Sequence, residues 1–150
     1  SYALLFLQEA PEQLELLRSD LPGMSEAATE EILRASGVTM HFRRTAAVDT
    51  ELGGVPIKQG DKVVMWYTSA NFDESVFTDP YRFDITRDPN PHVTFGTGRH
   101  VCLGASLARL EVRVFLEEFF SRVSSYRVGE PDRLRSNFIR GIKHLPIEIS

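Results

Sequence analysis

Apolar residues recur most regularly between residues 103 and 120. Four of them are spaced by four, three and four residues, which predicts one stripe along a helix: Leu103, Leu107, Leu110 and Val114. Other sides of the same helix are also apolar, at Val112, Phe115, Leu116 and Phe119. A helix that is apolar over most of its circumference is typically buried, so we expect this one to lie largely inside the protein.

Two further helices are predicted within the first 35 residues. The first spans residues 9–18 and carries Pro11 in its first turn, where the missing N–H costs little. A break follows at residues 21–23, and Ser25 is the expected N-cap of a second helix that ends at residue 34 or 35. Residues 9–31 hold seven acidic side chains and one basic side chain, a balance typical of solvated helix faces.

The chain changes to a β pattern after these helices. β-Branched and aromatic residues gather at residues 39–42 and 63–67, which predicts two strands. Between them, Gly53-Gly54 and Gly60-Asp61 predict turns.

The remainder of the chain is less regular. Residues 71–90 show no sustained period and are interrupted by prolines, so we expect a long loop with one short helix. Loops of this length are usually functional or disordered. Short strands are predicted at residues 126–128 and 147–149. The fold class expected for the whole is α+β, mostly α.

Composition and charge narrow the function. The 150 residues include 17 basic and 21 acidic ones, a net charge of −4, which disfavours a generally basic nucleic-acid binder. The single cysteine, Cys102, excludes an intramolecular disulfide and a zinc site made of cysteines alone. The longest apolar runs, residues 2–7 and 63–67, are far shorter than the ~20 residues of a membrane span. With no signal peptide visible, a cytoplasmic protein is expected.

Cys102 lies in a glycine-rich turn, residues 95–104, just before the long helix. Amides in a first helical turn lack internal partners, and the helix dipole favours a thiolate there. Gly96, Gly98 and Gly104 allow a tight backbone and the close approach of a flat ligand. This arrangement suits a thiolate that accepts hydrogen bonds from those amides and is still free to bind a metal from one side. The alternative is a buried structural cysteine; a phosphate loop is excluded because no Gly-Lys-Ser/Thr follows.

Three motifs in this chain resemble those of the cytochrome P-450 superfamily, the haem-thiolate monooxygenases. The turn follows the haem-binding signature Phe-x-x-Gly-x-x-x-Cys-x-Gly from Phe95 to Gly104. Glu31-Ile-Leu-Arg34 resembles the Glu-x-x-Arg helix, and Pro80-Tyr-Arg-Phe83 resembles the Pro-x-Arg-Phe element of the meander loop. The resemblance extends over nearly the whole chain, in the same order and spacing.

The resemblance implies a role for each matched residue. Cys102 is the expected axial ligand of the iron of haem b, and the catalytic residue. The other residues expected to bind the cofactor are His100, Arg44, Phe95, Gly96, Gly98 and Gly104. Arg44 and His100 would bind the propionates, with Arg43 as the rival of Arg44. Glu31, Arg34 and Arg82 would form a buried charged triad that locks the meander loop.

Substrate contacts are expected from two segments, one after the Glu-x-x-Arg helix and one near the C-terminus. The candidate residues are Val38, Met40, Phe138 and Ile139. Their apolar character suits a sterol-, lipid- or terpenoid-like substrate, although ordinary core packing would also explain some of them. Of the three histidines other than His100, His92 is expected to be structural, and no role is assigned to His41 or His144.

The chain also departs from the family pattern. Pro is usual in place of Gly37, Arg in place of Phe72, and an acidic residue in place of Tyr81. The oxygen-activation motif of the long distal helix is missing. We therefore expect residues 1–150 to be the C-terminal haem-binding portion of one larger monooxygenase domain, inactive without the N-terminal and distal-helix portion.

A group of basic residues suggests a surface on which an electron donor could dock. Residues 92–113 carry Arg99, Arg109 and Arg113 against Glu111, a net charge of +2, and the last two arginines share a helix face. The resemblance implies O₂ as co-substrate and a ferredoxin fed by an NAD(P)H-dependent reductase, which this patch would dock. A solvated helix face is the simpler explanation. Two other functions stay open: a haem-based redox or gas sensor, and an inactive truncated remnant with an exposed apolar face.

Overall fold

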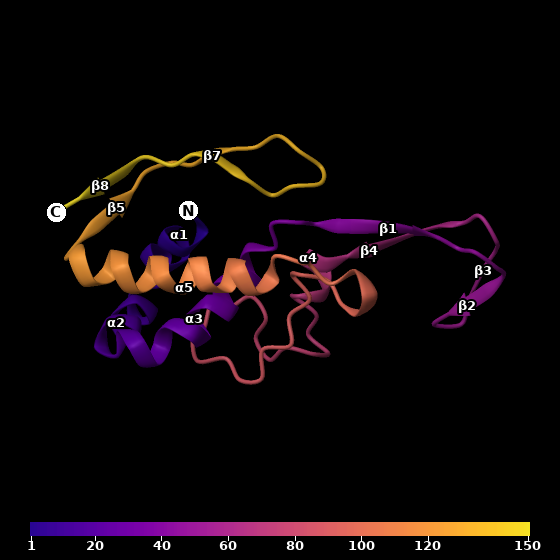
Figure 1. Ribbon diagram of the computed structural model, residues 1–150, viewed down its shortest axis with the longest axis horizontal. Coiled ribbons are helices and arrows are strands. Elements are labelled where there is room, and N and C mark those ends of the chain that lie inside the picture. The colour runs from indigo at the N-terminus through magenta and orange to yellow at the C-terminus, as the bar shows by residue number, and fades with distance from the viewer.

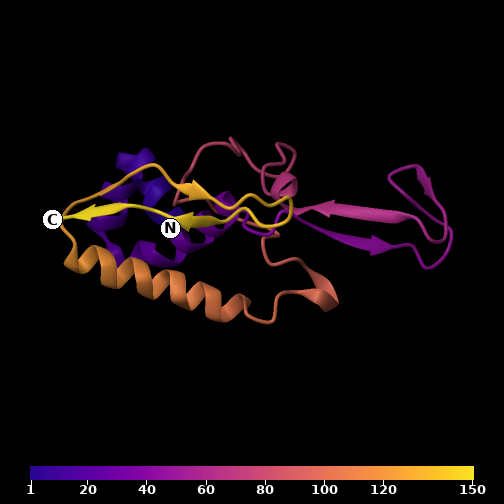
Figure 2. The same ribbon diagram turned by 90° about the horizontal axis from the view of Figure 1, so that it is seen from above.

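A computed structural model describes all residues, 1–150, as a helical body from which a long β-hairpin projects (Figures 1 and 2). The fold is α+β with more helix than strand, as predicted. The helices are α1 (Tyr2–Glu9), α2 (Pro11–Ser19), α3 (Leu21–Ser36), α4 (Tyr67–Ala70) and α5 (Ala105–Arg122), with a 3₁₀ turn at Gly98–His100. The strands are β1 (His41–Thr45), β2 (Thr50–Leu52), β3 (Val55–Ile57), β4 (Lys62–Trp66), β5 (Tyr126–Val128), β6 (Asp132–Arg133), β7 (Ile142–His144) and β8 (Ile147–Ile149).

The core lies where α1, α2 and α3 meet α5 and β5. Leu7, Leu17 and Leu116 are fully buried there, from three different helices. Ile85 joins the same cluster from the loop that follows α4, and its N–H donates to Gln13 Oε1 at 2.9 Å. This contact attaches the irregular loop to the helical body.

The strands form four antiparallel pairs. β1 pairs with β4 in the projecting hairpin, with Phe42 opposite Met65 and Arg44 opposite Val63, and β2 pairs with β3 at its tip. The tip turns through Gly53 and Gly54, whose φ angles of 58° and 79° are unfavourable for residues with a Cβ. At the other end of the molecule, β5 pairs with β8 and β6 with β7, and Figure 1 places these strands beside α1.

The predicted start of α3 is wrong. The N-cap is Asp20, whose carboxylate accepts a hydrogen bond from the N–H of Gly23 at 3.1 Å, so residues 21–23 form the first turn and not a break. Pro22 is tolerated there because first-turn N–H groups have no helical partner. Ser25 is buried inside the helix and donates to Glu117 Oε1 on α5.

Two smaller differences concern short helices. The chain already forms α1 at residue 2, a helix that its nearly unbroken apolar run did not reveal. The short helix expected within residues 71–90 lies just before them, as α4 at residues 67–70. The strands expected near residues 39–42, 63–67, 126–128 and 147–149 are confirmed to within a few residues.

The predicted burial of α5 is also wrong. Within the helix, which begins at Ala105 and not at residue 103, only Ala105, Leu116 and Phe120 are buried, and Leu107 is 59% exposed. Leu103, two residues before the helix, is fully exposed. α3 packs along one side of α5, and no other element among these residues covers the apolar stripe. No helix combines the length and the apolar character needed to cross a membrane.

Candidate functional site

The turn around Cys102 is closed by its own backbone. The N–H of Cys102 donates to the carbonyl of Phe95 at 2.9 Å, and the N–H of Ala105 donates to the carbonyl of Cys102 at 3.2 Å. Gly96 and Gly98 have φ angles of 70° and 71°, so both use the left-handed conformation that glycine allows. Sγ is exposed just before α5 and accepts no hydrogen bond from the chain, so the hydrogen bonds expected from the first-turn amides are absent.

A cavity of about 680 Å³ opens beside this turn. It brings together five of the residues selected from sequence: Cys102, His100, Phe95, Arg44 and Val38. The other lining residues are Leu33, Ser36, Thr39, Phe42, Tyr67, Thr94 and Ala108. Its walls therefore come from α3, β1, α4, the turn and α5, and Arg44 and His100, the two candidates for binding propionates, line the same cavity as the thiol.

The alternation of β1 distinguishes between its two arginines. Side chains on a strand point to opposite faces in turn, and Phe42 and Arg44 share the face that lines the cavity. Arg43 lies between them on the other face and does not line the cavity. The geometry thus favours Arg44 for any anionic group bound there.

The two predicted substrate segments meet each other. The N–H of Met40 donates to the carbonyl of Phe138 at 3.0 Å, and an isolated antiparallel bridge joins Thr39 to Ile139. Phe138 packs edge-on against Phe42, with 5.4 Å between ring centroids. Val38 lines the cavity directly, whereas Met40, Phe138 and Ile139 do not line it.

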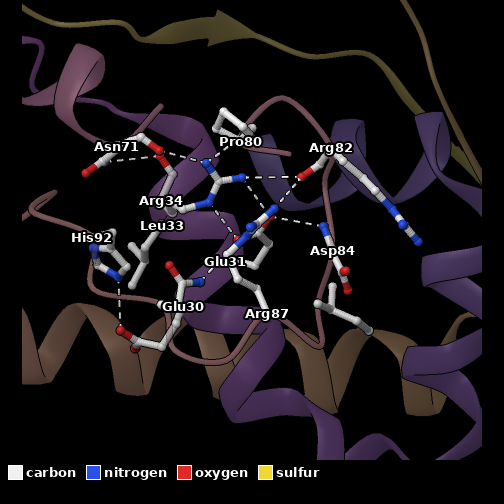
Figure 3. A network of polar contacts seen from close by, with 12 residues as sticks. Glu30, Glu31, Leu33, Arg34, Asn71, Pro80, Arg82, Asp84, Arg87 and His92 are labelled. Carbon is white, nitrogen blue, oxygen red and sulfur yellow. Dashed lines mark hydrogen bonds and ion pairs between the residues drawn. The ribbon is translucent and has the colours of Figure 1, made fainter. Parts of the chain in front are cut away.

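A buried ion pair anchors the loop under the site (Figure 3). Arg34 Nε and Nη2 donate to the two carboxylate oxygens of Glu31, each at 2.8 Å, and neither residue is exposed. Nη1 of Arg34 donates to the carbonyls of Asn71 and Pro80 at 2.8 and 2.9 Å. Buried charges need such partners, because desolvation would otherwise disfavour them.

The prediction that Arg82 is the third member of the buried triad is wrong. The side chain of Arg82 is exposed and points away from Glu31 (Figure 3). Only its backbone takes part, since its carbonyl accepts from Arg34 and Arg87 at 3.4 and 3.0 Å. Arg87 supplies the second cation, with Nε 3.2 Å from Glu31 Oε2 and a side chain only 9% exposed.

Sequence reasoning missed the role of Asn71, which is fully buried. Its Nδ2 donates to the carbonyl of Arg34 at 3.2 Å and to Thr94 Oγ1 at 2.8 Å, and its Oδ1 accepts from the N–H of Val93 at 2.8 Å. Asn71 thus attaches α3 to the segment that enters the Cys102 turn. The position of Asn71 at the end of a helix does not predict this role, because its partners lie 22 to 37 residues away.

Sequence reasoning also missed Glu30, which was counted as part of a solvated face. Oε1 of Glu30 accepts from Arg109 Nε at 2.7 Å, and Oε2 accepts from His92 Nε2 at 3.0 Å. Burial alone would raise the pKa of Glu30, but the hydrogen bonds from His92 and Arg109 outweigh it and lower the pKa to about 2. The predicted basic patch is correspondingly weaker, because the charge of Arg109 is neutralised by this pair.

The residues of the cavity fit the haem that the sequence predicts. Cavities of about 300–1,000 Å³ with mainly apolar walls are typical of small-molecule and cofactor sites. Leu33, Phe42 and Phe95 supply apolar wall, and Cys102 supplies a sulfur ligand of the type that binds haem iron. Arg44 offers a guanidinium suited to a propionate carboxylate.

Comparison of the sequence with known proteins gives a family and several relatives. The sequence profile of the family "Cytochrome P450" matches residues 16–140. Curated relatives include the protein named cytochrome P450 126 of Mycobacterium tuberculosis (53% identical over 147 residues), linalool 8-monooxygenase of Pseudomonas putida (45% over 148) and methyl-branched lipid omega-hydroxylase of Mycobacterium tuberculosis (46% over 149). The alignments cover 97–98% of this chain and 35–36% of each relative, so the chain spans about a third of their length.

Solved structures agree with the sequence comparison. The complex of P450BioI with an acyl carrier protein that carries hexadec-9Z-enoic acid superimposes with a TM-score of 0.95 at 40% identity, covering 99% of this chain and 39% of that one. A Mycobacterium marinum cytochrome P450 in complex with pseudoionone gives a TM-score of 0.94 at 42% identity, covering 97% and 36%. These 150 residues therefore have part of the fold seen in those structures.

Proposed function

Since this chain belongs to the cytochrome P450 family, we propose that it is the haem-thiolate portion of a monooxygenase, with Cys102 as the axial ligand of haem b. The observation that carries the proposal is the cavity that Cys102 shares with Arg44 and His100. The protein would insert one oxygen atom of O₂ into a C–H bond of its substrate and reduce the other to water, using two electrons and two protons. Such a protein needs the remaining length of its relatives, and in particular a distal wall.

The chain's own residues would hold the cofactor in a defined orientation. Arg44 and His100 are the proposed partners of the propionates, while Phe95, Gly96, Gly98 and Gly104 shape the turn that presents Sγ. Leu33 and Ala108 contribute apolar wall that excludes water. Haem held by a cysteine thiolate supplies O–O bond cleavage, because the thiolate donates electron density to the iron.

An apolar substrate of the lipid, sterol or terpenoid class fits the rim of the cavity. Val38 and Phe42 line it, and Phe138 packs against Phe42. Ile139 and Met40 join the same two segments through backbone pairing with Thr39 and Phe138. Two relatives point the same way, since their names describe the oxidation of linalool and of methyl-branched lipids.

For the electron donor we propose a ferredoxin served by an NAD(P)H-dependent reductase. The exposed cations on this side of the molecule are Arg99 and Arg113. Arg109 is paired with Glu30 at 2.7 Å, whereas Arg113 makes only a longer contact, 3.9 Å, with Glu117. An acidic partner would be steered to these charges, with an association rate that falls as salt rises.

The ferrous–carbon monoxide absorption spectrum tests this function. We expect the haem-loaded protein that contains this chain to show the strongly red-shifted Soret band of a thiolate ligand, and Cys102→Ser to lose it. Val101→Ala, a change at the exposed neighbour of the cysteine, serves as the matched control and should keep the band. Absence of the band in the unmodified protein would refute the haem-thiolate assignment.

A further inference from the structure

Glu30 joins three segments that meet beneath the Cys102 turn. It belongs to α3, and its carboxylate binds Arg109 of α5 with both oxygens, through Nε at 2.7 Å and Nη2 at 3.0 Å. Oε2 also accepts from His92, whose side chain is 2% exposed and which lies three residues before Phe95. A bidentate contact of this kind fixes the plane of the guanidinium as well as its distance.

The guanidinium that Glu30 orients lies against the turn itself. Arg109 Cζ is 4.9 Å from the centroid of the Phe95 ring, within the range of a cation–π contact. The carbonyl of Phe95 accepts the N–H of Cys102 at 2.9 Å, and this bond closes the turn. A continuous series of direct contacts therefore leads from Glu30 through Arg109 and Phe95 to the backbone of Cys102.

We infer that Glu30 is a positioning residue for Cys102, which it holds in place through Arg109, His92 and Phe95. The inference rests on the proposed haem-thiolate function, because the position of Sγ matters only where it binds iron. Glu31, the next residue, faces the meander loop and Arg34 instead. The two adjacent carboxylates on α3 thus hold different parts of the site: Glu31 holds the loop and Glu30 holds the turn.

A second link between α3 and α5 provides a matched control. Ser25 Oγ donates to Glu117 Oε1 at 2.7 Å and joins the same two helices, but neither residue contacts the Cys102 turn. If Glu30 only held the helices together, Ser25→Ala would have the same consequences as Glu30→Gln. Arg109→Lys is equally informative, since it keeps the positive charge and loses the bidentate, planar contact.

The experiment compares Glu30→Gln, Arg109→Lys and Ser25→Ala in the haem-loaded protein. Three quantities are measured: the rate of haem transfer to an acceptor apoprotein, the fraction of ferrous–carbon monoxide complex with the thiolate Soret band, and the urea midpoint of unfolding. Residues that orient a metal ligand typically change metal affinity by about 10–100-fold, so haem release should rise about 10-fold in the first two variants. The thiolate band should also decrease in Glu30→Gln and Arg109→Lys. Ser25→Ala should change neither the rate of haem release nor the thiolate band.

The outcomes separate this inference from the function on which it rests. A normal band in the unmodified protein together with unchanged haem release in Glu30→Gln and Arg109→Lys would overturn the positioning role alone. Equal acceleration in all three variants would also overturn it, since a general loosening of α3 against α5 would then suffice. No thiolate band in the unmodified protein would refute the proposed function and this inference with it. If Glu30→Gln does not fold, Arg109→Lys against Ser25→Ala decides in the same way.

Discussion

At the scale of single residues, Arg82 and Arg87 show what a sequence motif predicts and what it does not. The Pro-x-Arg-Phe motif contains Arg82, yet Arg87 makes the ion pair with Glu31, and Arg82 contributes its carbonyl. Both arginines lie in the same loop, five residues apart, and only the path of the backbone determines which side chain turns inward. That path depends on partners in α3, which no local pattern reveals.

Substitution of Arg34 and of Arg82 should therefore give unequal losses of stability. Arg34→Met leaves the carboxylate of Glu31 buried without its main partner, which should cost about 3–5 kcal/mol of the free energy of unfolding. Arg82→Ala keeps the carbonyl that the network uses, so its effect should stay within about 0.5 kcal/mol. Urea unfolding of the complete protein measures both, and an equal loss in the two variants would show that the side chain of Arg82 does belong to the buried network.

The acid stability of the protein should depend on Glu30. Its pKa in the folded state is about 2, below the ordinary value of 4.5, so its ionised form stabilises the folded state. This contribution is complete above pH 4.5 and is lost as the pH falls toward 2. The difference in unfolding free energy between the unmodified protein and Glu30→Gln should thus be constant near neutrality and shrink below about pH 4.5. A difference that stayed constant down to pH 3 would show that the carboxylate is not stabilised by its partners.

At the scale of elements, the Cys102 turn is the part most completely predicted from sequence. Its glycines, its cysteine and the helix that follows all lie within a few residues, and local chemistry determines their structure. The burial of α5 could not be predicted in the same way. A stripe of Leu107, Leu110 and Val114 shows that a helix has an apolar face, but not whether anything among these residues covers it.

The two left-handed glycines of the turn should differ in their tolerance of alanine. A Cβ on Gly96 would lie 3.2 Å from Tyr67 Oη, whereas a Cβ on Gly98 would meet nothing within 4 Å. Each alanine incurs about 1–2 kcal/mol for the left-handed backbone, and Gly96→Ala must in addition displace Tyr67, which lines the cavity. We expect Gly96→Ala to impair haem binding more than Gly98→Ala, as measured by haem titration of the two variants. Equal affinities would mean that Tyr67 moves aside freely.

At the scale of the whole molecule, the site is assembled from segments distant in sequence. Sequence motifs identified Cys102 in the turn and the buried pair of Glu31 and Arg34, but not the polar contacts that hold those motifs together. Asn71 and Glu30 have that connecting role, and their partners lie 22 to 79 residues away. Such residues look ordinary in a sequence because only the completed fold brings their partners near.

The surface around the Cys102 turn should respond to charge reversal. Arg113→Glu should slow reduction by an acidic ferredoxin about 10-fold at low salt, and the difference should fade as salt screens the charges. Arg127→Glu makes the same change on β5, at the other end of α5, and is the matched control (Figure 1). Stopped-flow reduction of the complete protein across a salt series provides the rates. Equal rates for the two variants at every salt concentration would exclude this patch as the docking surface.

The hydrogen bond between Asn71 and Val93 bears on how much the loop between these two residues can vary in length. It joins the two ends of the intervening segment, whose later part is also attached to the helical body through Ile85 and Arg87. Residues 74–76 are exposed at the outer edge of that segment. Each doubling of loop length costs only about 0.6 kcal/mol of closure entropy. Insertions at this edge should accordingly be absorbed locally, which makes it a natural position for a reporter or affinity tag that leaves the cysteine turn undisturbed.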